Sequence, residues 1–495
     1  MPPKLVLCVI DAMAPEMLER TVASGAAPVL ERLMERGRYV SSCVAAFPSV
    51  TPVCAASIVT GAGQDAHKIP AMNWFHREED RYVEYGSSFR AAQQFGIARQ
   101  LTDTVYNMNR VHLSSETPTV FESLDDAGVR TAGTTYLMYR GRYRHEPQRD
   151  TTLTRVASRL MRHPVMGPRE LFYADIFASR RTSCRSGLGM PGVRDRHSGC
   201  VSSYLVENDL FDFLLLSLPD NDWYSHKYGP DAQVRSLAHA DLQLARVMKA
   251  AGGIDRFLDE HAVIAMADHS QAPIIATIAL QDELDELGVL GPARSSSGSS
   301  ADEQPRIAVC PSQRAAMVYA LHESERDSIR ALVETRALAV EGVDLVMWLE
   351  RDAHEAPREG VISSPEHGEL RFSPGDSVID PRGGSWSVDG ALAAIDGAIE
   401  DGVLRTPSYP DALSRVWSAL TCPTSGEVLL SATPGYEFLD WGRQAHLGGG
   451  SHGSLHASDS LGALILSGVS LPEREPTQWA IRDVASLILR HFEAE

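Results

Sequence analysis

The sequence predicts an α/β fold in which a mostly parallel sheet is covered by helices on both faces. Apolar strand-like segments alternate with helical patterns, beginning with a strand at residues 5–10 and a helix that opens at Pro15. Such alternation is typical of parallel sheets. In addition, acidic residues follow directly after apolar runs, as Asp11 does after the first one. Ligands of parallel sheets gather at the carboxyl ends of the strands, so these residues are the first candidates for a functional site.

Further elements of the sheet and its helices follow from the same patterns. Residues 27–36 have helical spacing, residues 39–45 have the pattern of a strand, and small and apolar residues recur at helical spacing over 51–61. The other expected elements are helices at 119–127, 231–251 and 479–492 and strands at 130–136, 211–218 and 262–266.

Composition and charge are those of a soluble globular enzyme. Of the 495 residues 43% are hydrophobic and 22% are charged, which is an ordinary balance. The net charge of −19 argues against nucleic acid as a partner. It leaves a small anionic substrate open, because a bound metal ion inverts the local field. The sequence does not predict the oligomeric state.

The start of the chain and its cysteines predict a cytoplasmic protein. Met1 leads into the first strand without a signal-peptide pattern, and no apolar stretch approaches the roughly 20 residues that span a bilayer. The seven cysteines are scattered, with no Cys-x-x-Cys pair. This pattern favours free thiols in a reducing compartment over a disulfide framework.

The domain organisation is expected to be one core with an inserted subdomain. The core comprises residues 1–290 and 425–495, and a small α+β subdomain occupies 300–424. A serine- and glycine-rich linker at 295–300 is expected to be flexible. The subdomain is indicated by a strand at 315–321, a helix at 323–336 and a strand at 343–350, and the chain is expected to return to the core at 426–438.

Residues 140–200 form an arginine-rich segment that is interpreted as a second insertion. It contains 13 arginines, no lysine and five acidic residues. One interpretation is a solvated surface. The other is a lid that binds an anionic substrate, because guanidinium groups match the geometry of phosphate.

Three expected strand ends carry residues that can bind a metal ion. Asp11 follows the first strand, although an aspartate at this position is often only a helix cap. Asp222 and His226 lie four residues apart after the strand at 211–218, and Asp268 and His269 follow the strand at 262–266. Such mixed aspartate and histidine ligands indicate a site for two metal ions, with zinc favoured.

A glycine-rich loop at 448–456 adds two histidines. His452 is the favoured metal ligand, and His456 is expected to lie behind the ligands or to contact substrate. The glycines allow the backbone to approach a metal ion closely.

Two hydroxyl groups, those of Ser49 and Thr51, precede the helical run at 51–61. A hydroxyl at a helix N-terminus is usually a cap. Next to a metal ion it becomes a nucleophile, because coordination lowers its pKa.

Together these motifs resemble those of the type I phosphodiesterase/nucleotide pyrophosphatase branch of the alkaline phosphatase superfamily. That branch has Phe-Pro-x-x-Thr with a Val-Thr-Gly whose glycine is ten residues later, a pattern that Thr51 and Gly61 match and Ser49 does not. Its Pro-Asp-x-x-Gly-His-x-x-Gly-Pro resembles residues 219–230, with Ser225 in place of glycine.

The resemblance covers about residues 4–75, 205–275 and 425–470, and it implies a three-layer α/β/α core. It implies that Thr51 is the nucleophile between two divalent ions, most favourably Zn²⁺ with Mn²⁺ as an alternative, and that Asn73 binds a phosphoryl oxygen. By the same resemblance one ion is held by Asp222, His226 and His452, and the other by Asp11, Asp268 and His269.

The implied activity is metal-dependent hydrolysis of a small phosphate ester, most favourably a phosphodiester, through a phosphothreonine. The residues after the nucleophile, 52–55, depart from the usual Phe-Pro-Asn-His of the branch, and this departure concerns the substrate side of the site. The alternatives are a phosphomonoesterase or phosphonate hydrolase, transfer to an acceptor other than water, and a non-catalytic binding scaffold. A sulfatase is disfavoured, because the Cys-x-Pro-x-Arg context is missing at Thr51.

Overall fold

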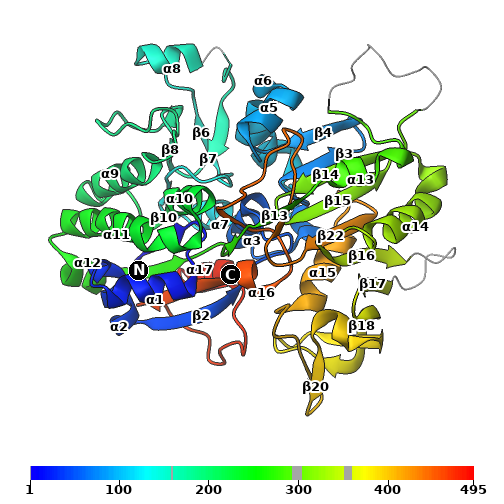
Figure 1. Cartoon of the computed structure of the whole chain (residues 1–495). Helices are drawn as coiled ribbons and strands as arrows, with labels where there is room; N and C mark the ends of the chain where they lie inside the picture. Colours follow the sequence, from blue (N-terminus) through cyan, green and yellow to red (C-terminus); the bar gives the residue numbers. More distant parts are fainter. Residues whose placement is uncertain (1, 158–159, 293–303, 351–358, 495) are drawn as a thin grey trace.

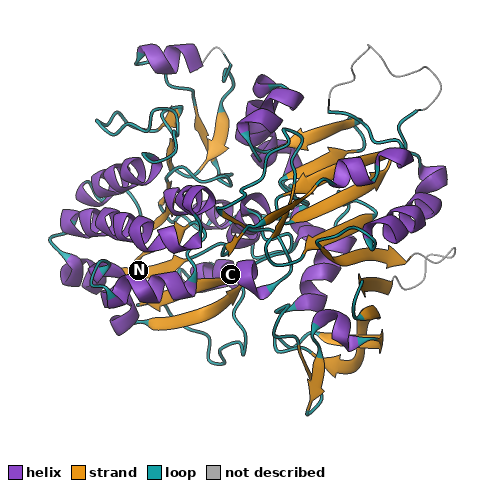
Figure 2. Cartoon of the chain, in the orientation of Figure 1, coloured by secondary structure: helices purple, strands orange, loops and turns teal. Residues whose placement is uncertain are grey.

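The computed structural model describes residues 2–157, 160–292, 304–350 and 359–494. The serine-rich linker expected at 295–300 lies outside these residues. In the described part of the chain, most strands belong to two large sheets, one of eight strands and one of nine. The sheets lie side by side, with helices packed around them (Figures 1 and 2).

The eight-stranded sheet confirms the predicted mostly parallel α/β core. Neighbouring strands from β11 through β1, β10 and β5 to β8 are parallel, whereas β2, β25 and β9 pair antiparallel at the two sides. In spatial order the strands are β2 (Arg38–Val44), β25 (Leu461–Ser467), β11 (His261–Met266), β1 (Lys4–Ile10), β10 (Phe213–Leu218), β5 (Thr131–Gly133), β8 (Glu170–Tyr173) and β9 (Phe177–Ala178).

Helices cover both faces of this sheet. Because side chains alternate along a strand, Leu7 and Val9 of β1 lie in one hydrophobic cluster, and Cys8 and Ile10 lie in the other. The second cluster includes side chains from five helices: α1 (Pro15–Ala23), α2 (Pro28–Arg36), α9 (Arg194–Glu207), α11 (Gln233–Ala250) and α12 (Ile254–Glu260). The first cluster includes side chains from α3 (Thr51–Thr60), α7 (Val120–Asp126) and α17 (Asp483–His491).

The nine-stranded sheet includes a strand that was expected in the core. Residues 426–438 were expected to return to the core, but β22 in this segment pairs antiparallel with both β15 and β16. The chain rejoins the first sheet only at β25. The strands are β14 (Ile307–Ser312), β15 (Ala315–Ala320), β22 (Val428–Ala432), β16 (Val343–Glu350), β17 (Glu359–Ser364), β18 (Gly368–Ile379), β19 (Ser385–Gly390), β21 (Val403–Arg405) and β20 (Ala398–Glu400).

Shorter elements connect and flank the two sheets. Among them are α4 (Gln64–His67), α5 (Phe89–Phe95), α6 (Ile97–Thr102), a π-helix (Asp103–His112), α8 (Thr152–Ala157), α10 (Asp220–Tyr228), α13 (Leu280–Glu283), α14 (Arg326–Ala337), α15 (Ala412–Thr421) and α16 (Ala457–Ser460). The short strand pairs are β3 (Asn73–His76) with β4 (Arg81–Glu84), β6 (Tyr143–His145) with β7 (Val165–Gly167), β12 (Ala272–Pro273) with β24 (Gly450–Ser451), and β13 (Ala276–Ile278) with β23 (Tyr436–Phe438).

One prediction about the cysteines is wrong. Cys184 and Cys200 form a disulfide, with their Cα atoms 5.7 Å apart. The spacing along the sequence did not show this pairing, because the loop before α9 folds back onto that helix. The other cysteines are buried and free. Because two cysteines are paired, the cysteines no longer support the expectation of a reducing compartment. The cytoplasmic location stays a prediction.

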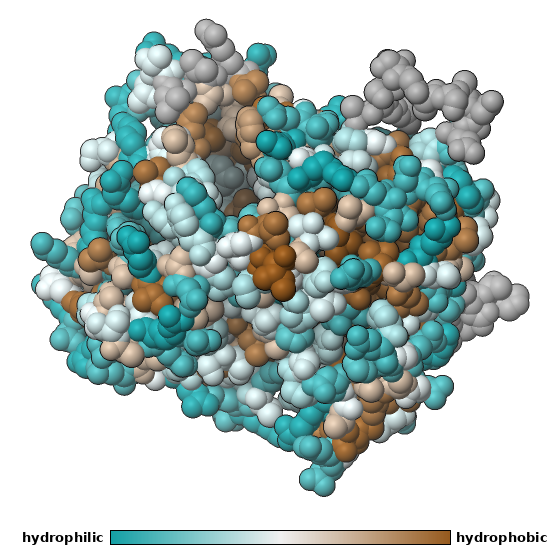
Figure 3. Space-filling view, in the orientation of Figure 1, coloured by the Kyte–Doolittle hydropathy of each residue, from teal (hydrophilic) through white to brown (hydrophobic). Residues whose placement is uncertain are grey.

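The visible surface is largely hydrophilic, with apolar patches near the middle of the face shown in Figure 3. Within the described ranges, no helix combines the length and the apolar character needed to cross a membrane.

Candidate metal centre

Three acidic residues meet at one edge of the eight-stranded sheet. Asp11 follows β1, Asp222 lies in the helix α10 that follows β10, and Asp268 comes two residues after β11. In the register of the sheet, Ile10 pairs with Leu218, and Val9 pairs with Met266. Because the three strands are adjacent and parallel, their carboxyl ends deliver these side chains to the same place.

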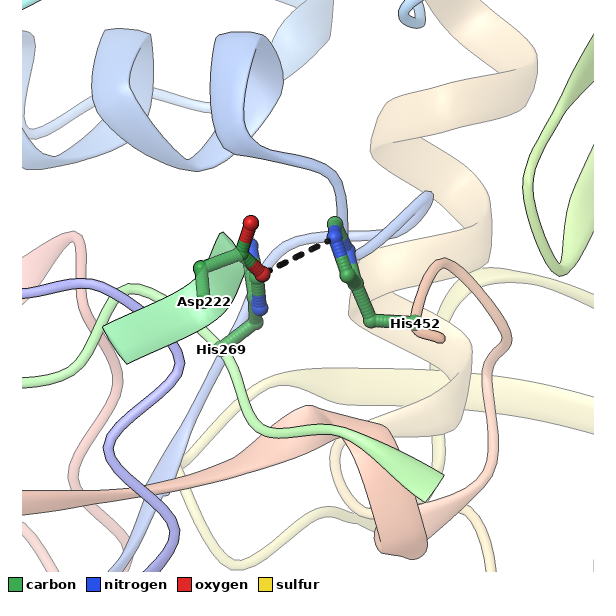
Figure 4. Close-up of side chains that lie close together, drawn as sticks. All are labelled: Asp222, His269 and His452. Carbon is green, nitrogen blue, oxygen red and sulfur yellow. Dashed lines mark ion pairs between the residues drawn. The ribbon is translucent and has the colours of Figure 1, made fainter. Parts of the chain in front are cut away.

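Histidines complete two groups of potential ligands at this edge. One group comprises Asp222, His269 and His452, and the other comprises Asp11, Asp268 and His269; within each group the ligand atoms lie within 4.8 Å of one another. Figure 4 shows the first group, with an ion pair of 3.5 Å between Asp222 Oδ1 and His452 Nε2.

His226 reaches the first group from the helix that carries Asp222. Its Nε2 lies 3.3 Å from Asp222 Oδ2. The structure therefore brings together the six residues predicted as metal ligands, and His269 lies close enough to belong to both groups.

Each of the three histidines is held by a backbone carbonyl through Nδ1. The acceptors are Gly450 O for His226 at 2.8 Å, Ser270 O for His269 at 3.1 Å and Ser49 O for His452 at 2.7 Å. Since a carbonyl oxygen can only accept, Nδ1 must carry the proton in each ring. Nε2 is thereby left to bind a metal ion, an arrangement that is typical of metal-binding histidines.

Several polar atoms that face the centre lack hydrogen-bond partners. Asp11 Oδ1, Asp268 Oδ2 and His452 Nε2 are buried and have no hydrogen-bond partner among the described residues. Buried polar groups are normally satisfied, so unpaired ligand atoms that converge on one point fit divalent cations. The donor set, carboxylates with imidazole nitrogens, fits the predicted zinc.

Burial and the neighbouring charges shift the pKa values of the groups in the centre. Burial raises the pKa of Asp11 well above its usual value, and the neighbouring Asp268 adds to this effect. Burial alone would raise the pKa of Asp222, but His226 outweighs it and holds the pKa below its usual value. For His452 burial and the adjacent His269 lower the pKa. Two cations would compensate the concentrated negative charge.

Thr51 lies at the centre, as the first residue of α3. Its Oγ1 is 3.3 Å from His269 Nε2, and it lines a cavity of about 500 Å³ together with Asp11, Asp222 and His452. The unpaired N–H groups of a helix N-terminus favour anions. Ser49, in contrast, is buried and donates a hydrogen bond to Ser454 O, which matches a structural role.

The structure does not bring Asn73 and His456 into the cavity. Asn73 is 1% exposed, and its amide nitrogen donates to Val83 O at 3.0 Å across the β3–β4 hairpin. The side chain of His456 caps α16 by accepting a hydrogen bond from Ser458 N. Neither residue is among those that line the cavity.

The centre includes residues that the sequence did not indicate. Gln271 donates a hydrogen bond to Asp222 Oδ1. The ring of His446 stacks on His226 with centroids 3.9 Å apart, and Glu437 accepts a hydrogen bond from His446 Nδ1 at 2.8 Å. Gln313 lines the cavity from the second sheet. Gln271 ends the segment 267–271 that carries two of the predicted ligands. His446, Glu437 and Gln313 belong to no spaced motif, so no local pattern could have identified them.

The walls of the cavity combine aromatic and cationic side chains. Tyr136, Trp223, Lys227 and Arg194 lie among the lining residues. Lys227 Nζ is 5.1 Å from the Trp223 ring centroid, within the range of a cation–π contact. These walls suit a small anionic ligand with an apolar part.

Of the described arginines in the segment 140–200, Arg194 lines the cavity, whereas a lid would be expected to place more of them there. The Nε of Arg194 is itself paired with Asp220 at 2.8 Å. Other arginines of the segment pair with carboxylates: Arg140 and Arg142 with Glu122, and Arg180 with Glu170. These three arginines are engaged in ion pairs and are not among the residues that line this cavity.

Glu84 supports the part of the cavity wall formed by Gly86 and Ser87. It is 2% exposed, and Oε1 accepts hydrogen bonds from Gly86 N at 2.7 Å and from Ser87 N. Burial raises the pKa of Glu84 to about 7. The folded state therefore binds this proton more tightly than the unfolded state, and stability falls as pH rises from about 4.5 through about 7.

We expect Glu84→Gln to remove this part of the pH dependence. Between pH 4.5 and 8 the wild type should lose up to about 3 kcal/mol relative to the variant, because a pKa shift of one unit corresponds to about 1.4 kcal/mol. Denaturant unfolding at several pH values measures the difference. Glu78→Gln, in the exposed turn of the same hairpin, is the control. Parallel curves for wild type and Glu84→Gln would contradict the prediction.

The α/β fold with its large, mostly parallel sheet matches that of alkaline phosphatase superfamily members. The sequence matches the profile of the type I phosphodiesterase/nucleotide pyrophosphatase family over residues 5–454. The chain therefore belongs to this family. The family and its structural neighbours indicate a phosphoester hydrolase. A sequence search against curated proteins finds no match.

Solved structures with the same fold include two kinds of enzyme. Phosphonoacetate hydrolase from Sinorhizobium meliloti 1021, in complex with phosphonoformate, aligns with a TM-score of 0.55 and 18% identity, covering 100% of this chain and 95% of that chain. Murine ectonucleotide pyrophosphatase/phosphodiesterase 5 aligns with a TM-score of 0.57 and 12% identity, covering 99% and 95%. At these identities the likeness shows the fold.

Proposed function

We propose that this protein hydrolyses small phosphate esters, with phosphodiesters as the favoured substrates, through a phosphothreonine at Thr51. The observation that carries this proposal is the position of Thr51 Oγ1, 3.3 Å from His269 Nε2. Thr51 lines the same cavity as Asp11 and Asp268, each of which has a buried carboxylate oxygen without a hydrogen-bond partner in the described chain. A hydroxyl becomes a useful nucleophile where its surroundings lower its pKa.

The proposed cofactors are two divalent metal ions. Members of the family typically depend on such ions, and the mixed donor set favours zinc, with manganese as the alternative. When bound, the ions supply positive charge that lowers the pKa of a hydroxyl and neutralises phosphoryl oxygens. The residues proposed to hold them are Asp222, His226 and His452 for one ion, and Asp11, Asp268, His269 and Thr51 for the other.

The proposed reaction has two steps. Thr51 Oγ1 loses its proton to solvent and bonds to phosphorus, while the bond from phosphorus to the leaving-group oxygen breaks. Water then attacks the phosphothreonine, which releases the phosphoryl product and restores the hydroxyl. The N-terminus of α3 favours the anionic oxygens throughout. In support, an inactive threonine-to-alanine variant of murine ectonucleotide pyrophosphatase/phosphodiesterase 5 was solved in complex with AMP.

The proposed ligand is a small anionic ester. The cavity of about 500 Å³ accommodates a small phosphate ester. Aromatic Tyr136 and Trp223 offer an apolar wall, and Lys227 offers a cation.

Comparison of two chromogenic substrates tests the proposal. The purified protein, loaded with zinc or manganese, is assayed with bis-p-nitrophenyl phosphate and with p-nitrophenyl phosphate. We expect a higher kcat/KM for the diester. A preference for the monoester would support a phosphomonoesterase, and a protein with neither activity nor bound metal would support a non-catalytic scaffold.

A phosphonate hydrolase is the second candidate. It is favoured by the alignment with phosphonoacetate hydrolase and by Lys227 and Arg194 in the cavity wall, which suit a ligand with a second anionic group. Release of inorganic phosphate from phosphonoacetate, measured beside the diester assay, distinguishes the two functions.

A further inference from the structure

A hairpin of the second sheet reaches into the metal centre of the first. Ser312 at the end of β14 pairs with Ala315 at the start of β15, so Gln313 and Arg314 form a two-residue loop. Gln313 lines the same cavity as Thr51 and Asp222. The second sheet thus supplies a polar side chain to a centre whose strand-end carboxylates come from the first.

The backbone of Gln313 has an unfavourable conformation. Its φ angle is 61°, in the left-handed region. Two-residue hairpin loops that need a positive φ normally use glycine or asparagine, because other residues pay a steric penalty there. Strain of this kind is often found at functional sites. A glutamine at a position where glycine would be less strained therefore points to a role for its side chain.

The side chain of Gln313 points to the metal centre and is only partly satisfied. The residue is 9% exposed, and its amide nitrogen lies 3.5 Å from His226 Nε2. The amide oxygen is buried without a hydrogen-bond partner in the described chain. That oxygen can only accept a hydrogen bond, so an anionic phosphoryl oxygen would not satisfy it. The amide N–H, which lies beside a proposed metal-ligand nitrogen of His226, is the group that can donate to such an oxygen.

The hairpin is fixed relative to the centre. Gln313 O accepts a hydrogen bond from Phe438 N at 2.9 Å, and Arg314 N donates to His452 O at 3.0 Å. Arg314 and Asp459 form a completely buried ion pair of 2.7 Å. Such support holds a catalytic side chain in place before substrate arrives.

From these contacts we infer that Gln313 is a substrate-contacting catalytic residue whose amide N–H donates a hydrogen bond to a phosphoryl oxygen beside Asp222 and His226. The inference rests on the proposed function, because it needs a phosphoryl ligand. A neutral amide donor suits this place, since it adds no negative charge to a site that binds an anion. Gln313 thereby fills the role that the family resemblance gave to Asn73, whose amide nitrogen donates to Val83 O.

Two variants of Gln313 separate the contact from the strain. Gln313→Met keeps the size and removes the amide, and Gln313→Gly also removes the strain at φ 61°. Loss of one donor to a developing oxyanion typically costs about 10² to 10³ in kcat. We expect this loss in both variants, with unchanged metal content and with a higher thermal midpoint for Gln313→Gly. Gln281→Met is the control, because Gln281 is a buried glutamine with an unpaired oxygen outside the cavity and should keep full activity.

Binding of inorganic phosphate to the metal-loaded protein, measured by calorimetry, tests the contact without turnover. We expect at least about tenfold weaker binding in both Gln313 variants. Wild-type activity and phosphate affinity in Gln313→Met would overturn the inference. Loss of a metal ion from Gln313→Met would also overturn the inference, because it would show that Gln313 is a metal ligand. Absence of ester hydrolysis in the wild type would instead refute the proposed function, and phosphate affinity would still decide the role of Gln313.

Discussion

Replacing Thr51 with alanine is expected to abolish phosphoester turnover while the bound metal ions remain. The alanine removes the oxygen that lies 3.3 Å from His269 Nε2 and leaves the six aspartate and histidine ligands in place. Losing a nucleophile typically costs roughly 10⁴-fold or more in kcat. Steady-state assays with the diester and elemental analysis of the same preparation measure both quantities.

Two matched variants control the Thr51 experiment. Thr60→Ala removes a hydroxyl from the other end of α3, where Thr60 Oγ1 donates to Ala56 O, and should leave turnover unchanged. Thr51→Ser keeps a hydroxyl at the helix N-terminus and should retain measurable activity. Normal turnover by Thr51→Ala would refute the assignment of the nucleophile, even if the protein proved to be a hydrolase.

The second large effect is expected for His452→Ala, which should lose one of the two metal ions together with the activity. His452 is 1% exposed, its Nδ1 donates to Ser49 O, and its Nε2 has no hydrogen-bond partner in the described chain. The lost ion also lowers stability, because a ligand at about 100 times its Kd stabilises the folded state by about 2.7 kcal/mol. Metal analysis and thermal unfolding, with and without a chelator, measure the change.

His456→Ala is the matched control for this experiment. His456 lies in the same loop, but its side chain caps α16 and is outside the cavity lining. This variant should keep its metal content and its activity. Equal metal loss in both variants, or full metal content in His452→Ala, would show that the choice of His452 as the ligand is wrong.

The core and its strand-end residues were predictable because both depend on local patterns. Apolar runs at β1, β10 and β11 revealed buried parallel strands, and parallel strands present their carboxyl ends at one edge. The structure indeed brings Asp11, Asp222 and Asp268 to that edge. The grouping of these three carboxylates could therefore be predicted without knowing any contact between distant segments.

The remaining parts depend on contacts between distant segments, which periodicity does not reveal. The strand β22 reads like any apolar strand, and only its pairing with β15 and β16 places it in the second sheet. Gln313 reaches the centre because the two sheets pack together. For Asn73 the pairing of β3 with β4 decides which carbonyl its amide meets. No spacing rule contains this information.

The distance along the chain between His452 and its partners has a consequence for biosynthesis. His452 Nδ1 bonds to Ser49 O across 403 positions of sequence, and this loop is followed by β25, which fills the place between β2 and β11 in the first sheet. A nascent chain that has exposed only its first half presents Asp11 and Thr51 without the last histidine. Domains form as their residues leave the ribosome, so tight metal uptake should begin only after the segment that carries His452 has emerged.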